Sequence, residues 1–208
     1  GYYNALEAAK SFENVTVLDS GHLSSSMGLA VLYAASMAEN HAGKAEIVKT
    51  VKRLRRYISS AFIIDSTHMM CRSGRISKRI QVLCDALLLH PVLVLRKSKM
   101  VVGSMEVGDF PHVAKRYIKK VFLDAKNIDR RILFITYAGM EEKRIRYIQE
   151  LVRQYCPFER IYVQKASSAI ASNCGPGSFG LLFMKKNEAV ISFSEASKIE
   201  TENEHAIN

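Results

Sequence analysis

Short apolar runs alternate along this chain with longer segments of helical periodicity, and this alternation limits the fold more than any other feature. The runs predicted as strands are residues 14–20, 60–65, 91–97, 100–107, 130–139, 160–167 and 177–186. After a short helical opening, amphipathic helices are predicted over residues 24–43, 44–58, 76–89, 111–125 and 140–155. This order is typical of an α/β fold, and a hairpin turning at Ser98 and Lys99 makes the predicted sheet mixed.

The pattern changes near Ser59 and Ser60, where two successive helices give way to a strand-rich half. We therefore predict a first unit over residues 1–58 and a second α/β domain with a mixed sheet over residues 59–187. Residues 188–208 are rich in Glu, Ser and Asn and predict an acidic polar tail.

The formal net charge of +10 is unevenly distributed, because residues 188–208 carry −4 and leave +14 on the rest of the chain. A basic body favours an anionic partner, such as nucleic acid, phosphate, a carboxylate lipid or an acidic protein surface. Charge reports the sign of a partner and not its identity, and solvated helix faces account for many of the same lysines and arginines. No apolar run approaches the roughly 18–20 residues of a membrane span, so we predict no span and a cytoplasmic location.

Four cysteines, Cys71, Cys84, Cys156 and Cys174, are widely spaced and form no C-x-x-C pair. This spacing favours reduced, largely buried thiols over a zinc site or a disulfide framework. Phosphate-loop and dinucleotide-binding signatures are also absent from the sequence.

Two polar segments are candidate anion sites. In "DSGHLSSSMG", Ser24 and its neighbours lie between a predicted strand and a predicted helix, where hydroxyl and amide groups can hold an anion or simply cap the helix. In "MMCRSGRISKR", Arg75 stands in a cluster of basic residues beside Gly74. A guanidinium there can pair with a carboxylate or a phosphate, and a structural tie to another loop is an equal alternative.

The segment "SNCGPG" is a third candidate, because Gly175 and Gly177 around Pro176 let a bound group approach the backbone closely. Cys174 is not favoured as a nucleophile, because a catalytic thiol needs a base nearby and the six histidines are scattered. The fourth candidate is the basic helix that contains Arg53, Arg55 and Arg56. It has no interleaved aromatic residues or motif typical of a nucleic-acid-binding module.

Taken in order, five segments give the chain a resemblance to the DegV family. These are "GYYNAL", "VTVLDSGHLSSSMG", "FIIDSTHMMCRSGRIS", "LLLHPVLVL" and "NCGPGSFGLLF". They are similar to the family's S-G-T-Y-x-x-A, V-x-x-I-D-S-x-x-x-S-x-G-x-G, R-G-G-R-I-S, L-x-x-K-P-I-L and H-x-G-P-G elements. The order and spacing agree from Gly1 to about Lys186, and only the tail lies outside the match.

The resemblance implies a DegV-like α/β fold in which residues 1–58 are the C-terminal part of a first domain. It also implies a function: a long-chain fatty acid is buried, and its carboxylate is presented to a separate bacterial fatty acid kinase. The chain itself would perform no chemistry and would need no cofactor or metal. Matched by motif, the fatty-acid-binding residues are Ser24, Arg75, Asn173, Gly175 and Gly177.

Three departures from the family pattern bear on this reading. Asn173 stands where the family has histidine, which keeps a hydrogen-bond donor and removes an ionisable group. The family's arginine after the hairpin has no counterpart in "GSMEVGDFPH". The chain also begins just past the family's carboxylate-binding serine, so we expect a C-terminal portion of a longer protein or a truncated member.

Two other functions remain open from the sequence. One is a regulatory or interaction module that docks an acidic partner on the surface around Arg53, Arg55 and Arg56, with a vestigial lipid site. The other is a nucleic-acid binder, whose retention on DNA or RNA would depend steeply on salt. The fatty-acid reading is the leading one, and it predicts no nucleic-acid partner.

Overall fold

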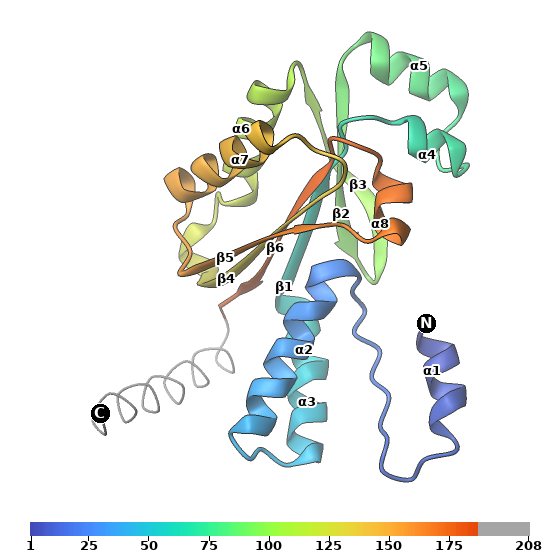
Figure 1. Cartoon of the computed structure of the whole chain (residues 1–208), viewed down its shortest axis with the longest axis vertical. Coiled ribbons are helices and arrows are strands. Elements are labelled where there is room, and N and C mark those ends of the chain that lie inside the picture. Colours follow the sequence, from blue (N-terminus) through green and yellow to red (C-terminus); the bar gives the residue numbers. More distant parts are fainter. Residues whose placement is uncertain (187–208) are drawn as a thin grey trace.

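The computed structural model describes residues 1–186, and its centre is a six-stranded sheet with helices on both faces (Figure 1). The strands are β1 (Ile58–Ile63), β2 (Leu89–Arg96), β3 (Lys99–Val107), β4 (Ile128–Tyr137), β5 (Arg160–Lys165) and β6 (Phe179–Lys185). The α-helices are α1 (Tyr2–Ala9), α2 (Ser24–Glu39), α3 (Lys44–Leu54), α4 (His68–Arg72), α5 (Lys78–Ala86), α6 (Phe110–Val121), α7 (Glu142–Tyr155) and α8 (Ser168–Cys174). Short 3-10 turns η1 (Arg55–Tyr57) and η2 (Ala125–Asn127) precede β1 and β4.

The strands lie in the order β3-β2-β1-β6-β4-β5. Only the neighbours β4 and β5 run parallel, and the other neighbouring pairs are antiparallel. The predicted α/β fold with a mixed sheet is therefore confirmed. β1 and β6 lie at the centre, so the segments that follow β1 and precede β6 meet at one end of the sheet.

One face of the sheet is covered by α6 and α7, and we call it the α6–α7 face (Figure 1). Val113, Tyr117 and Ile118 follow helical spacing on α6 and are almost fully buried, and a proline occupies the first turn of this helix as predicted. The Tyr117 hydroxyl donates a 2.7 Å hydrogen bond to the carbonyl of Ala61 on β1. On the sheet side, the fully buried residues of this cluster include Leu133, Ile135, Phe179, Leu181 and Phe183.

A buried ion pair joins β3 to the same helix layer. Glu106 is 2% exposed, and its carboxylate accepts hydrogen bonds from Arg116 Nε at 3.0 Å and from Lys120 Nζ. Burial alone would raise the pKa of Glu106, but the hydrogen bonds and charges of Lys120 and Arg116 outweigh it and lower that pKa. The carboxylate therefore stays ionised inside this layer.

The opposite face is covered in part by α2 and α3, and we call it the α2–α3 face. Its buried residues include Tyr33 of α2, Leu54 of α3 and Phe62 of β1. The Phe62 ring lies across β6 at Gly180, where a Cβ atom would come within 2.3 Å of the ring. Towards the two sheet edges this face opens, because Tyr162 is 42% exposed and Val102 is 54% exposed.

Several sequence-based predictions of local structure were wrong. Residues 14–20 form no strand, and the six-stranded order of the described residues leaves them out. Their alternating valines favour a strand, but an extended segment becomes one only when a neighbouring strand pairs with it, and Val15 is instead 47% exposed. The hairpin turns one residue earlier than predicted, at Lys97 and Ser98, both of which have positive φ.

Other boundaries also moved. The helix predicted to extend up to His90 and Pro91 ends at Ala86 instead. His90 and Pro91 belong to β2. The short helices α4 and α8 were not predicted. The predicted division after residue 58 falls just inside β1, after its first residue, and it stays a prediction. The hydrophobic cluster under α2 and α3 contains residues from both sides of that position. The predicted acidic tail, 188–208, lies outside the described residues.

Candidate functional site

The turn between α8 and β6 holds two of the sequence-predicted residues, Gly175 and Gly177. Gly175 and Gly177 have φ of +78° and +79°, a region that strongly favours glycine. The Gly177 amide donates to the Ala138 carbonyl at 2.8 Å, which fixes the turn to the end of β4. A Cβ atom at Gly177 would lie 2.1 Å from the Asp65 carboxylate. The group that approaches this glycine most closely is therefore part of the protein itself.

Asp65, which follows β1, connects this turn to three other parts of the molecule. Its amide donates to Ser178 Oγ at 3.1 Å, and Ser178 Oγ in turn donates to the Cys174 carbonyl at 2.8 Å. Its carboxylate lies 3.2 Å from Arg144 Nη1 of α7 and 3.6 Å from His90 Nδ1 of β2. Arg144 offsets the negative charge of Asp65, which would otherwise repel a second carboxylate placed beside the turn.

Arg75 and Asn173 reach the same end of the sheet from two helical segments. Arg75 lies between α4 and α5, and α4 packs against α8. Met69 of α4 contacts Gly175 of the turn. Burial raises the pKa of the Cys174 thiol, and the positive charge of Arg75 acts in the opposite direction. Arg75 Nη1 donates to Ser73 Oγ at 2.7 Å, and Asn173 Nδ2 donates to the Ala169 carbonyl at 2.6 Å.

Ser24 is connected to the turn less directly. It is the first residue of α2 and has a φ of +55°, and no side chain caps this helix, so the predicted serine cap was wrong. The neighbouring Ser25 is buried, and its hydroxyl lies 2.6 Å from Thr136 Oγ1 of β4. Gln164 of β5 donates to Ser25 Oγ as well. Thr136 is two residues before Ala138, so this polar cluster lies at the same end of the sheet as the turn.

The structure thus gathers Arg75, Asn173, Gly175 and Gly177, while α2 is joined to them through Ser25 rather than through Ser24. Sequence reasoning missed Asp65, Ser25, Thr136 and Gln164. The signal that was available is a polar residue inside or just after an apolar strand, as with Thr136 in β4. Whether the gathered residues hold a carboxylate stays a prediction.

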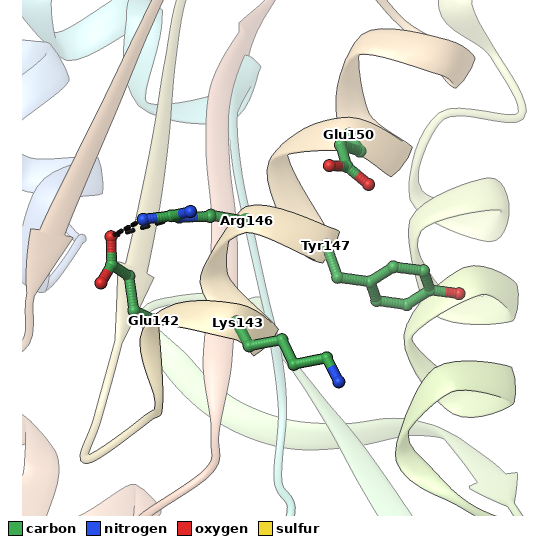
Figure 2. Close-up of a pocket in the computed structure, with 5 residues that line it drawn as sticks. All are labelled: Glu142, Lys143, Arg146, Tyr147 and Glu150. Carbon is green, nitrogen blue, oxygen red and sulfur yellow. Dashed lines mark hydrogen bonds and ion pairs between the residues drawn. The ribbon is translucent and has the colours of Figure 1, made fainter.

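Two surface pockets are found elsewhere on the molecule. One, of about 460 Å³, lies along the exposed side of α7 and is lined by Glu142, Lys143, Arg146, Tyr147 and Glu150 (Figure 2). Glu142 and Arg146 form an ion pair there, so its lining does not suit an acyl chain. The second pocket, at the start of β1, is described below.

Four apolar side chains that could line a slot for an acyl chain divide into two groups. Phe62 and Phe183 are 3% and 1% exposed and belong to the two hydrophobic clusters, so neither is free to line a slot without repacking. Met27 is 48% exposed on α2, one turn from Ser24, and Met69 contacts Gly175. The burial of an acyl chain therefore stays a prediction.

Within residues 1–186, no group of three or more His, Cys, Asp or Glu side chains could hold a metal ion. None of the helices in that range is long and apolar enough to cross a membrane.

Comparison with known proteins gives relatives that carry a DegV domain. A DegV domain-containing protein of Caldanaerobacter subterraneus subsp. tengcongensis is 28% identical over 176 residues, which is 83% of this chain and 61% of that protein. The chain thus spans about three fifths of the length of this relative.

Solved structures share the fold. A DegV family protein from Thermus thermophilus, whose structure is described as showing fatty acid binding, superposes with a TM-score of 0.74 and 27% identity. The match covers 89% of this chain and 66% of that one. The Fak B3 protein of Streptococcus pneumoniae fatty acid kinase, solved with linoleic acid, superposes with a TM-score of 0.72 at 14% identity, over 88% of this chain and 64% of that chain. At that identity the likeness shows the fold alone.

The family model described as "Uncharacterised protein, DegV family" matches residues 1–186, which are the residues whose structure is described above. Two of the segments that carry the resemblance in the sequence, those that contain Asp65 and the turn at Gly175 and Gly177, meet at one end of the sheet. The chain therefore belongs to the DegV family.

Proposed function

We propose that this chain binds a long-chain fatty acid and holds its carboxylate at the turn between α8 and β6. The observation that carries this proposal is the packing of α4 against α8, which brings the segment that carries Arg75 towards the helix that carries Asn173, beside the turn. The likeness to the Thermus thermophilus protein supports the same ligand class.

The energetics of a fatty acid match a site that combines apolar surface with a few donors. Burying one methylene stabilises by about 0.8 kcal/mol, so a sixteen-carbon chain supplies roughly 10 kcal/mol. An unpaired carboxylate in an apolar site costs several kcal/mol. Arg75 would supply a charge-assisted hydrogen bond and Asn173 a neutral one. Met27, Val31 and Leu32, which are 45–60% exposed on α2, offer apolar surface on the side of the polar cluster.

The finer part of the proposal is that the chain presents the carboxylate to a fatty acid kinase and performs no covalent step itself. Burial raises the pKa of the Cys174 thiol, so this thiol stays protonated near neutral pH and is a poor nucleophile. Asp65, whose carboxylate approaches Gly177, is paired with Arg144. Both observations suit a site that binds an anion and leaves phosphoryl transfer to a partner.

The test begins with mass spectrometry of organic extracts from the purified protein, in which a long-chain fatty acid is expected. Affinity for a fluorescent fatty acid is then measured for Arg75→Ala and for a control, Arg79→Ala, which removes an equally exposed arginine from α5. A hydrogen bond to a charged group contributes about 1.5–3 kcal/mol, so Arg75→Ala is expected to weaken binding by roughly 10–150-fold. Equal affinities of the two variants would contradict the site, and extracts without acyl species would contradict the ligand.

A further inference from the structure

A second pocket, of about 350 Å³, lies at the start of β1 and is separate from the turn between α8 and β6. Its lining includes Gly21 and His22 from the segment before α2, Arg55 and Arg56 from η1, and Lys97 and Ser98 from the β2–β3 hairpin. Asp65 lies beyond the other end of β1. At a rise of about 3.3 Å per residue, it is roughly 23 Å from Ile58 at the start of that strand.

Arg55 holds the three segments of this pocket together. Its Nη2 atom donates to Asp19 Oδ2 at 3.2 Å and lies 3.4 Å from Ser98 Oγ, while its carbonyl accepts a 2.7 Å hydrogen bond from His22 Nε2. Gly21 has a φ of +63°, and a Cβ atom there would lie 2.3 Å from the same Nη2 atom. The positive φ favours glycine at this position, and the missing side chain lets the segment pass close to the guanidinium. The three segments around the pocket are therefore held in a defined arrangement.

The charge in the pocket is not balanced. Asp19 pairs with Arg55, but neither Arg56 nor Lys97 has a carboxylate partner within residues 1–186. Their two positive charges face the same hollow from η1 and from the hairpin turn. Cations gathered around a concave surface attract an anion more strongly than the same charges spread over a flat one.

His22 adds an unsatisfied polar atom to the wall. A carbonyl can only accept a hydrogen bond, so the proton of the neutral ring is on Nε2 and Nδ1 is an acceptor. Nδ1 is buried and has no hydrogen-bond partner. Burial lowers the pKa of His22, so the ring stays neutral near pH 7 and does not add a third charge. Nδ1 is buried too deeply for a ligand in the pocket to reach, so His22 helps to form the wall without binding the ligand.

We infer that this pocket is an anion site for a phosphate group, held by Arg56 and Lys97 with the Arg55 framework behind them. Phosphate offers several acceptor oxygens to the two cations. This assigns a role to the basic segment around Arg55 that fatty-acid binding does not use.

The test is a titration of the ¹⁵N-labelled chain with inorganic phosphate at constant ionic strength. Saturable shifts of the amide signals of residues 21–22, 55–58 and 95–98 are expected. The double variant Arg56→Ala/Lys97→Ala should bind at least about 10-fold more weakly, because it loses both charged donors. The control Lys49→Ala/Lys52→Ala removes the same charge from the exposed side of α3 and should stay within about twofold of the unaltered chain. Arg55 is left intact because it holds the pocket together.

A parallel arm with phosphatidic acid vesicles, compared with phosphatidylcholine vesicles, identifies the source of the phosphate. Binding of both free phosphate and phosphatidic acid through Arg56 and Lys97 supports a lipid headgroup as the source, and binding of free phosphate alone supports a small soluble ligand. Equal weakening in the two double variants, non-saturable shifts, or binding to vesicles without binding of free phosphate would each overturn the proposal.

Discussion

The α6–α7 face and the α2–α3 face of the sheet share the same central strands but differ in how completely helices cover them. On the α6–α7 face, Leu133 and Leu181 are fully buried, and Glu106 is paired inside the layer. On the α2–α3 face, the cluster around Phe62 and Leu182 is equally buried, yet Tyr162 and Val102 towards the sheet edges are exposed. The comparison suggests that one face serves stability and that the other retains surface for a ligand.

The largest expected effect is a difference in stability loss between a fully buried leucine on the α6–α7 face and an exposed tyrosine on the α2–α3 face. Leu133→Ala on the α6–α7 face should destabilise the protein by about 2–5 kcal/mol, because it leaves a cavity in a fully buried cluster. Tyr162→Ala on the α2–α3 face should cost about 1 kcal/mol, mainly through lost stacking on Phe134 at a ring distance of 5.2 Å. Urea unfolding of the two variants measures the difference. Equal losses would remove the distinction between the faces.

A second effect tests the buried ion pair. Glu106→Gln should lower the free energy of unfolding at pH 7 by about 1.5–3 kcal/mol, since the carboxylate accepts hydrogen bonds from two cations. The folded-state pKa of Glu106 is lowered, so its contribution is present above the ordinary value of 4.5 and is lost as the pH falls through the folded-state value. The stabilities of both proteins should therefore converge as the pH falls from 4.5 through the folded-state pKa. A gap that persists in acid would mean that packing, and not charge, explains the effect.

Substitutions at two glycines test how tightly the α2–α3 face is packed. Gly180→Ala should destabilise by about 1–3 kcal/mol, because the new methyl group would displace the Phe62 ring. Gly28→Ala lies inside α2 with nothing within 4 Å of the new Cβ atom, and it should stabilise by about 0.5–1 kcal/mol. Thermal unfolding of the two variants should show a loss of stability for Gly180→Ala and a gain for Gly28→Ala. A neutral Gly180→Ala would show that the ring is free to move.

The smallest effect concerns the polar cluster near the turn. Ser25→Ala removes a buried hydroxyl that bonds to Thr136 and Gln164, and it should cost about 1 kcal/mol. Ser172→Ala, on the exposed side of α8, should stay within about 0.5 kcal/mol of the unaltered protein. Denaturant midpoints compare the two serines, and indistinguishable values would argue against a structured cluster.

The sequence predicts strands best where they are long and apolar, as for β4 and β6, because burial on both faces leaves a continuous apolar run. It fails at residues 14–20, where alternation favours a strand but pairing decides the outcome. The short helices α4 and α8 carry too few residues to show a period.

The site residues, like the strands, could be predicted only where local chemistry determines them. The glycines of the turn were predicted from the chemistry of glycine and proline, but the reason for Gly177 was found only in the close approach of Asp65. Ser24 was chosen by its match to the family motif, whereas Ser25 is the residue whose hydroxyl lies against Thr136 of the sheet. Long-range pairs such as Asp65 with Arg144 leave no local pattern in the sequence.

The central claim is that ligand binding occurs at the end of the sheet beside the turn and along the α2–α3 face. Amide hydrogen exchange, measured with and without a sixteen-carbon fatty acid, tests it most directly, because bound ligand suppresses local opening. The account predicts slower exchange in residues 65–75, 136–139 and 173–178 and along α2, with α6 and α7 unchanged. Protection confined to α6 and α7, or no change anywhere, would contradict it.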